Sequence, residues 1–181
     1  MLKRIAAIIL LVLTVTVTSC AASATAGLQP YVDSYKGYQF LYPNGWTQVN
    51  AGKGPDVVFH DLINQMDNVS VVISPVPNGK TLAELGTPSE VGYKLSKNAI
   101  APAGSGREAE LLSAESLEKG DKSYYIFEYD VKLANDVHRH NLASVAVSRG
   151  KLFTLNLSTT ENSWQKRAYQ FNNVVKSFSV N

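Results

Sequence analysis

Three residues in one extended segment have side chains of the types that bind metal ions. Asp136, His138 and His140 alternate along the chain, and alternate side chains of a strand share one face. Imidazole nitrogen and carboxylate oxygen are ligands of Zn²⁺ and similar divalent ions. Ala143 and Val145 continue the opposite face, so we expect the histidine face to be the more exposed one. The segment is a candidate site for Zn²⁺ or another divalent ion such as Mn²⁺ or Ca²⁺, although an exposed histidine pair is more often only solvated.

A second pair of candidate metal ligands is His60 and Asp61. Adjacent residues of a strand point to opposite faces, so these two side chains meet one ion only at a strand end or at a bulge. We rank this pair below the first group.

Catalytic motifs are absent from the sequence. No serine lies in a Gly-x-Ser-x-Gly turn, and neither a phosphate-binding Walker loop nor a dinucleotide glycine fingerprint is present. The acidic residues nominate no pair for glycoside hydrolysis. We therefore predict a protein that is not an enzyme and requires no cofactor.

Composition indicates one folded domain with little net charge. The chain has 181 residues, of which 45% are hydrophobic and 18% charged. Seventeen Lys and Arg oppose fifteen Asp and Glu, and without Lys3 and Arg4 fifteen oppose fifteen. A neutral domain has no broad attraction for polyanions, so we expect no nucleic acid among its partners.

The amino terminus is typical of an exported lipoprotein. Residues 1–19 have a basic start and an apolar run of about 13 residues, which is shorter than the roughly 20 of a spanning helix. Val17-Thr-Ser-Cys20 resembles the bacterial lipobox, and Cys20 is the only cysteine. We predict a signal peptide at 1–19, lipid attachment at Cys20, a flexible tether over 20–34, and a folded domain over 35–181. The alternative is an ordinary signal peptide with an incidental cysteine.

Period-two patterns predict most of the folded part. Segments 38–42, 56–61, 68–74, 122–131, 138–149 and 151–159 have the alternation or the β-branched residues of strands, and 107–118 is a weaker candidate. Arg149-Gly150 predicts a hairpin turn. In the last segment, Phe153, Leu155 and Leu157 are expected to face the core, and Thr154, Asn156 and Ser158 to face out.

Two helices are predicted between and after these strands. Thr87-Pro-Ser-Glu90 is a capping box that begins a helix ending near Ile100. Steps of 4, 3, 4 and 3 separate Trp164, Ala168, Phe171, Val175 and Phe178, so they form one apolar helical stripe. Hairpin-linked strands that outnumber the helices predict an α+β domain with an antiparallel sheet covered by helices.

Three stretches carry a family resemblance. They are Tyr38-Gln-Phe-Leu-Tyr-Pro-Asn-Gly-Trp46, the run from Asp56 to Pro75 with Asn68-Val-Ser-Val-Val-Ile-Ser-Pro75 inside it, and His140 to Phe178 with Gly150-Lys-Leu-Phe153 and Trp164. In this order they resemble the PsbP family, the extrinsic lumenal proteins of photosystem II, and most closely its cyanobacterial lipoprotein members. His140 matches a histidine of the family pattern.

The resemblance implies an α/β/α sandwich on a central antiparallel sheet. It also implies a place on the lumenal side of the thylakoid membrane, photosystem II subunits as partners, and a non-enzymatic role in photosystem II assembly or in stabilising the oxygen-evolving complex. Plant members use a soluble amino-terminal extension, whereas this chain has a predicted lipid and tether, which favours a transient assembly role. The alternative function is a divalent-metal-binding exported lipoprotein.

Overall fold

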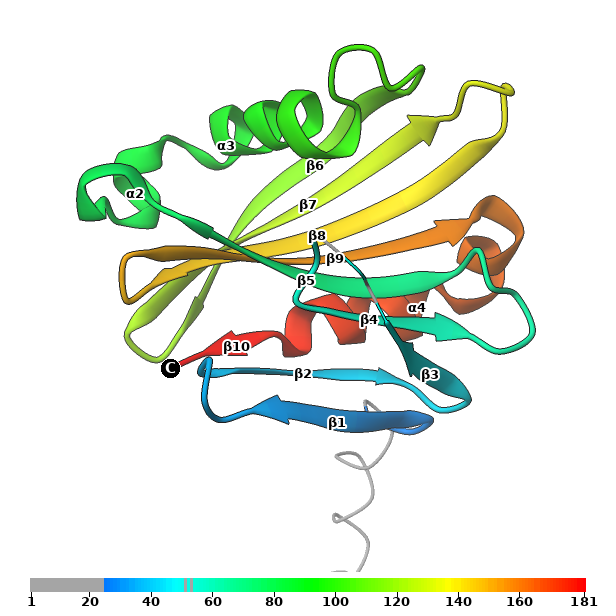
Figure 1. The fold of residues 1–181 in the computed structure, drawn as a ribbon, viewed down its shortest axis with the longest axis horizontal. Coiled ribbons are helices and arrows are strands. Elements are labelled where there is room, and N and C mark those ends of the chain that lie inside the picture. The colour runs from blue at the N-terminus through cyan, green and yellow to red at the C-terminus, as the bar shows by residue number, and fades with distance from the viewer. Residues whose placement is uncertain (1–24, 51, 53) are drawn as a thin grey trace, which may run out of the picture.

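The computed structural model describes residues 25–50, 52 and 54–181 (Figure 1). The predicted signal peptide, Cys20 and the first part of the predicted tether lie outside these residues. The strands are β1 (Leu28–Asp33), β2 (Tyr38–Pro43), β3 (Trp46–Val49), β4 (Val57–Asp61), β5 (Asn68–Pro75), β6 (Glu108–Lys119), β7 (Lys122–Lys132), β8 (His138–Ser148), β9 (Lys151–Thr160) and β10 (Ser179–Val180). The helices are α2 (Leu82–Leu85), α3 (Pro88–Leu95) and α4 (Glu161–Ser177), with a short 3₁₀ turn at Pro77–Gly79 and a π turn at Ser96–Ile100.

A seven-stranded sheet forms the middle layer. Its strand order is β3-β4-β5-β9-β8-β7-β6, and every neighbouring pair is antiparallel. In Figure 1, α2 and α3 lie above this sheet and α4 lies below it, next to a small sheet of β1, β2 and β10. The predicted α+β class and the α/β/α sandwich are confirmed.

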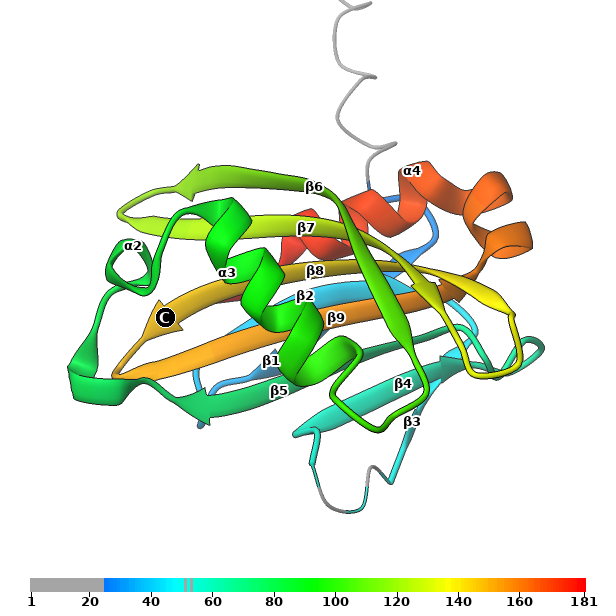
Figure 2. The same ribbon diagram turned by 90° about the horizontal axis from the view of Figure 1, so that it is seen from above.

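The β8–β9 connection is the predicted hairpin. Arg149 and Gly150 have φ values of 51° and 69°, as a type I′ turn requires, and Val147 pairs with Leu152 beside it. The two strands run next to each other through the centre of the sheet (Figure 2). A two-residue turn thus sets the register of the central strands.

Capping boxes begin both helices of the upper layer. In α3, the backbone N–H of Glu90 donates to Thr87 Oγ1, and the Thr87 N–H donates to Glu90 Oε2 at 2.9 Å, as predicted. Thr81 and Glu84 form the same box at α2, a helix that was not predicted. No helix within the described residues combines the length and apolar character needed to cross a membrane.

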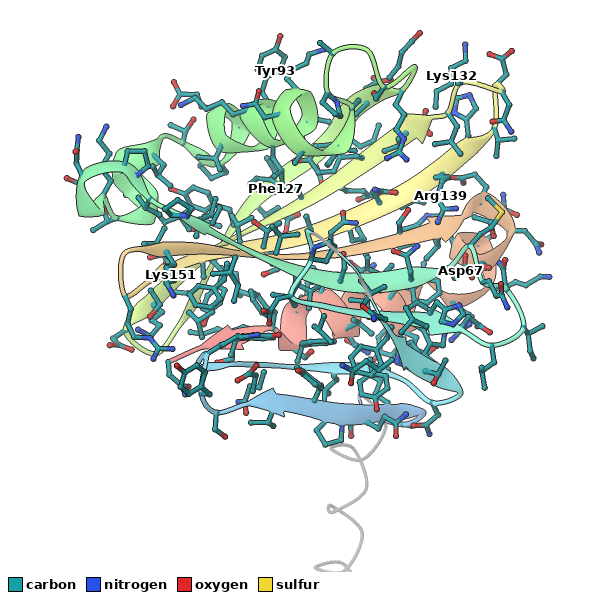
Figure 3. The ribbon with its side chains drawn as sticks, viewed as in Figure 1. Asp67, Tyr93, Phe127, Lys132, Arg139 and Lys151 are labelled. Atoms are coloured by element: carbon teal, nitrogen blue, oxygen red, sulfur yellow. The ribbon has the colours of Figure 1, made fainter. Side chains whose placement is uncertain are left out.

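Two apolar cores lie on opposite faces of the sheet. One contains Phe171, Val174 and Val175 of α4 with residues of β2 and the sheet, and the other includes Val91 of α3. β7 supplies Tyr124 and Ile126 to the first core, and Tyr125, Phe127 and Tyr129 to the second. Both faces of the strand are therefore covered, and Phe127 points toward α3 (Figure 3).

The predicted tether is too long. Leu28–Asp33, assigned to the tether over 20–34, forms β1 and pairs with β2 from Leu28↔Pro43 to Asp33↔Tyr38. The Tyr31 ring lies 5.3 Å from that of Phe40 and 5.4 Å from that of Phe59. The folded domain therefore includes residues well before the predicted boundary at 35.

Candidate functional site

The first predicted metal group does not converge. Asp136 lies in the β7–β8 turn with a φ of 59°, and its carboxylate pairs with Lys132 at 2.8 Å. His138 begins β8, and its Nδ1 lies 2.8 Å from the carboxylate of Asp130. The expectation that Asp136, His138 and His140 share one strand face was wrong for Asp136. This residue lies in the turn that precedes β8, so it is not part of the extended strand.

His140 is buried rather than exposed. Its side chain has 8% of its surface exposed, its Nε2 lies 2.8 Å from Glu128 Oε1, and its Nδ1 lies 3.4 Å from Glu161 Oε1. The ring stacks on Trp164 at 3.7 Å with an interplanar angle of 9°. The two carboxylates contact different ring nitrogens, so His140 links α4 to the sheet. The carboxylates are not placed around one ion.

Asp61 and His60 were the second predicted metal pair, but the carboxylate of Asp61 makes structural hydrogen bonds instead. Its Oδ1 accepts from the backbone N–H groups of Ile63 and Asn64, and its Oδ2 accepts from Trp46 Nε1 at 3.0 Å and Arg167 Nη1 at 3.1 Å. Burial alone would raise the pKa of Asp61, but these hydrogen bonds outweigh it and hold the pKa below its ordinary value. His60 is the adjacent residue of β4.

The predicted ligands therefore do not fit a metal ion as arranged here. Within residues 25–50, 52 and 54–181, no three His, Cys, Asp or Glu side chains are placed to hold one. Divalent-metal binding by Asp136, His138, His140, His60 and Asp61 stays a prediction that this geometry does not support.

A different site lies between α3 and the sheet. A cavity of about 880 Å³ separates α3 and its π turn from β5, β8 and β9, and we call it the α3 groove. Its apolar lining includes Leu85, Val91, Leu95, Ile100, Val145 and Leu152. Its polar lining includes Asn68, Ser70 and Ser74 of β5 and Thr154, Asn156 and Ser158 of β9.

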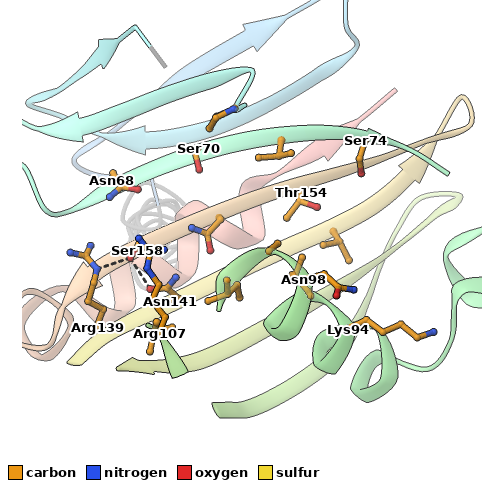
Figure 4. A pocket seen from close by; sticks show the side chains of 18 of the residues that line it. Asn68, Ser70, Ser74, Lys94, Asn98, Arg107, Arg139, Asn141, Thr154 and Ser158 are labelled. Atoms are coloured by element: carbon orange, nitrogen blue, oxygen red, sulfur yellow. Dashed lines mark hydrogen bonds between the residues drawn. The ribbon is translucent and has the colours of Figure 1, made fainter. Parts of the chain in front are cut away.

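The α3 groove has unbalanced positive charge. Lys94, Arg107 and Arg139 line it, and none of its described lining residues is Asp or Glu. Figure 4 shows Arg107 and Arg139 at one end, near Asn141 and Ser158, with Lys94 on α3 farther along. The groove is therefore chemically suited to an anionic group.

Arg139 is held in place by its neighbours. It is 8% exposed, its Nε donates to Ser158 Oγ at 2.9 Å, and its Nη2 donates to the backbone oxygen of Met66. Ser158 Oγ in turn donates to Asn141 Oδ1 at 2.7 Å (Figure 4). This chain of bonds orients a buried guanidinium at the groove end before any ligand arrives.

Burial lowers the pKa of Arg139, and the positive charge of Arg107 lowers it further. The carboxylate of Asp67 acts in the opposite direction. Asp67 is fully buried beside β5, and its Oδ1 accepts from the Thr160 N–H at 2.9 Å. The charges of Arg107 and Arg139 therefore outnumber that of Asp67, which leaves the groove end positive.

Asn156 lines the groove and has an unused acceptor beneath its surface. Its Oδ1 is buried and has no hydrogen-bond partner among the described residues. A buried unpaired carbonyl oxygen costs about 1–3 kcal/mol, which a ligand N–H or O–H would offset once the amide turns its oxygen into the groove.

Sequence reasoning missed the α3 groove. It placed Thr154, Asn156 and Ser158 on the outer face of β9, but Thr154 and Ser158 are buried. The available signal was the matching polar alternation of 68, 70 and 74, which lies beside that of β9 in the sheet. Only the strand order joins the two patterns, because β5 and β9 are far apart in the sequence.

The chain is similar to known proteins over nearly its whole length. A family model described as PsbP matches residues 26–180. CyanoP of Thermosynechococcus vestitus is 51% identical over 184 residues, which cover 99% of this chain and 100% of that protein. CyanoP of Synechocystis is 44% identical over 176 residues, covering 96% and 94%.

A solved structure has the same architecture. The solution structure of Synechocystis CyanoP aligns with a TM-score of 0.73 at 46% identity, and the alignment covers 91% of this chain and 99% of that one.

Proposed function

The chain belongs to the PsbP family, and from this premise we propose that it is a lipid-anchored protein-interaction module on the lumenal side of the thylakoid membrane. It binds photosystem II subunits, and it assists photosystem II assembly or stabilises the oxygen-evolving complex without catalysing a reaction. The observation that carries this proposal is the 51% identity to CyanoP over 99% of the chain.

The proposed anchor rests on the sequence alone. Val17-Thr-Ser-Cys20 resembles a lipobox, and lipid at Cys20 would hold the protein at the membrane surface. β1 begins at Leu28, so the stretch between Cys20 and the domain spans at most about 28 Å when extended. Such a short link raises the local concentration of the domain near membrane-bound partners.

The lipid favours assembly over permanent attachment. A membrane anchor keeps the domain near partners without a tight contact, so binding to any one intermediate is free to be weak and reversible. The surface of the domain also suits protein partners, because the β4–β5 loop exposes Ile63 at 96% beside the half-exposed Met66 of the groove.

The test is a pull-down from thylakoid membranes. The tagged full-length chain is expressed in a cyanobacterium, membranes are solubilised in mild detergent, and co-purifying proteins are identified by mass spectrometry. We expect photosystem II subunits, with assembly intermediates enriched over mature complexes. A Cys20→Ala chain should recover less, because it lacks the proposed anchor.

The control is the tag alone, exported to the same compartment. Recovery of photosystem II subunits at the level of that control, from both mature complexes and intermediates, would exclude the proposed role.

A further inference from the structure

We propose that the α3 groove binds an extended acidic segment of a partner protein, with a carboxylate of that segment held between Arg107 and Arg139. This inference rests on the proposed function in that the partner is a protein. The geometry specifies the charge of the segment, its length and its polypeptide nature.

The charge follows from the groove end. Arg139 is buried and uses its Nε and Nη2 on Ser158 and Met66, while Arg107 is exposed and forms no ion pair among the described residues. Both arginines line the same end of the groove (Figure 4), and the charge of Arg107 lowers the pKa of Arg139. A carboxylate between them would relieve this repulsion and accept charge-assisted hydrogen bonds from Arg107.

The length follows from β5. Asn68, Ser70, Val72 and Ser74 all line the α3 groove, and they occupy alternate positions of one strand. Six residue steps at about 3.3 Å give a groove roughly 20 Å long. A free phosphate or a single carboxylate would fill only the arginine end, whereas an extended segment of about six residues spans the whole groove.

The two walls suit a polypeptide. The helix wall is largely apolar at Leu85, Val91 and Leu95, and the sheet wall presents hydroxyl and amide side chains of β5 and β9 together with Val72, Val145 and Leu152. An extended peptide presents alternate side chains to opposite sides, so its apolar residues meet α3. Its backbone N–H groups can donate to the amide oxygen of Asn156 once that side chain turns the buried Oδ1 into the groove.

Strand addition is not the mode of binding. β5 and β9 are internal strands with a neighbour on each side, so their backbone groups are already paired. Side chains therefore recognise the segment, and substitutions of those side chains test the site directly.

The experiment measures peptide binding to the purified full chain in detergent by fluorescence anisotropy. The probe is a labelled eight-residue peptide of alternating leucine and serine with two glutamates at one end. A matched peptide carries glutamine at those positions. We expect the glutamate peptide to bind at least tenfold more tightly, and Arg107→Gln to remove most of that difference.

Matched variants separate the site from general charge. Lys166→Gln removes an exposed charge on α4, on the opposite face of the sheet, and should leave binding unchanged. Asn156→Leu keeps the charges but removes the unpaired acceptor, and it should weaken both peptides alike. Arg139→Lys should weaken the glutamate peptide, with circular dichroism to verify folding.

Three results would overturn the inference. They are equal affinity for the two peptides, binding of the glutamate peptide unaffected by Arg107→Gln, and Arg107-dependent binding of phosphatidylglycerol vesicles or inorganic phosphate without any peptide preference. Failure here is distinct from failure of the proposed function. An Arg107→Gln chain that recovers photosystem II subunits like the unchanged chain contradicts only the groove, whereas loss of recovery by the unchanged chain contradicts the function.

Discussion

The carboxylate of Asp61 joins three separate parts of the chain. It accepts from Trp46 of β3, from Arg167 of α4, and from two backbone N–H groups of the loop after β4. A side chain that was predicted to be a metal ligand thus holds β3, α4 and the loop after β4 together. Hydrogen bonds to a charged group each contribute about 1.5–3 kcal/mol, so Asp61 is a strong structural residue.

This arrangement predicts an acid-sensitive contribution to stability. The folded pKa of Asp61 lies below its ordinary value of 3.8, so its stabilisation is present at neutral pH and is lost as the pH falls through the folded pKa. Asp61→Asn should lower the free energy of unfolding by about 1–3 kcal/mol at pH 7 and by less at pH 3. Urea denaturation at both pH values measures the difference, and an equal loss at both would contradict it.

The two histidines of β8 should differ in their effect on stability. His140→Ala removes the stack on Trp164 and the contact with Glu128 Oε1, at a cost of about 2 kcal/mol. His138→Ala, its matched control, breaks a half-exposed pair with Asp130 and should cost less than about 1 kcal/mol. Thermal unfolding of both variants compares them, and equal losses would refute the structural role of His140.

At the scale of elements, local signals were sufficient where the structure is local. Arg149-Gly150 predicted the hairpin, Thr87 with Glu90 predicted the start of α3, and the apolar stripe predicted α4. Thr81 and Glu84 carry the same capping signal as α3, but their helix has only one turn and was missed.

The features that the sequence did not predict depend on contacts between residues that are far apart along the chain. β1 has a weak pattern of its own and is stabilised by Tyr31 against Phe40 and Phe59. The α3 groove depends on β5 lying beside β9, which no local pattern specifies. The predicted histidine site did not form for two reasons. Asp136 lies in the β7–β8 turn and pairs with Lys132, and the imidazole rings of His138 and His140 each pair with a carboxylate of β7.

The place of β1 in the fold predicts the cost of a late truncation. A chain beginning at residue 35 lacks β1, so it exposes the aromatic cluster that Tyr31 covers. It should be less stable than a chain beginning at residue 26 by at least about 2 kcal/mol, because Tyr31 is partly buried and deleting a fully buried aromatic side chain costs about 3–5 kcal/mol. Urea midpoints measure this, and Tyr31→Ala in the longer chain should reproduce most of the loss. Equal midpoints would restore the boundary at 35.

α3 sits close to the sheet because it contains a glycine. A Cβ at Gly92 would lie 3.0 Å from a ring carbon of Phe127, which is fully buried, and 3.1 Å from Leu111. Tyr129 also donates its hydroxyl to the Gly92 backbone oxygen at 3.0 Å. The helix wall of the groove therefore depends on the absence of a side chain.

Gly92→Ala tests this close approach. Alanine favours the helix by about 1 kcal/mol, but overpacking against a buried ring costs about 1–3 kcal/mol, so we expect a net loss of about 1 kcal/mol. Ser89→Ala, at an exposed position of the same helix, should instead stabilise slightly. Chemical denaturation compares the two, and a stabilising Gly92→Ala would show that Phe127 moves aside.

At the scale of the whole molecule, one sheet serves two cores. Side chains of β7, β8 and β9 alternate between the α4 side and the α3 side, so both helical layers pack on these three strands. The groove wall formed by α3 therefore depends on strands that α4 also stabilises from the other face.

This shared sheet predicts cooperative unfolding. Phe127→Ala empties part of the α3 core and Phe171→Ala part of the α4 core, and each should cost about 3–5 kcal/mol because both rings are fully buried. Since the cores share strands, each variant should still unfold in one transition, with equal calorimetric and van't Hoff enthalpies in scanning calorimetry. A separate early transition in Phe127→Ala alone would mean that the α3 layer opens independently, and the groove would then form only in part of the folded population.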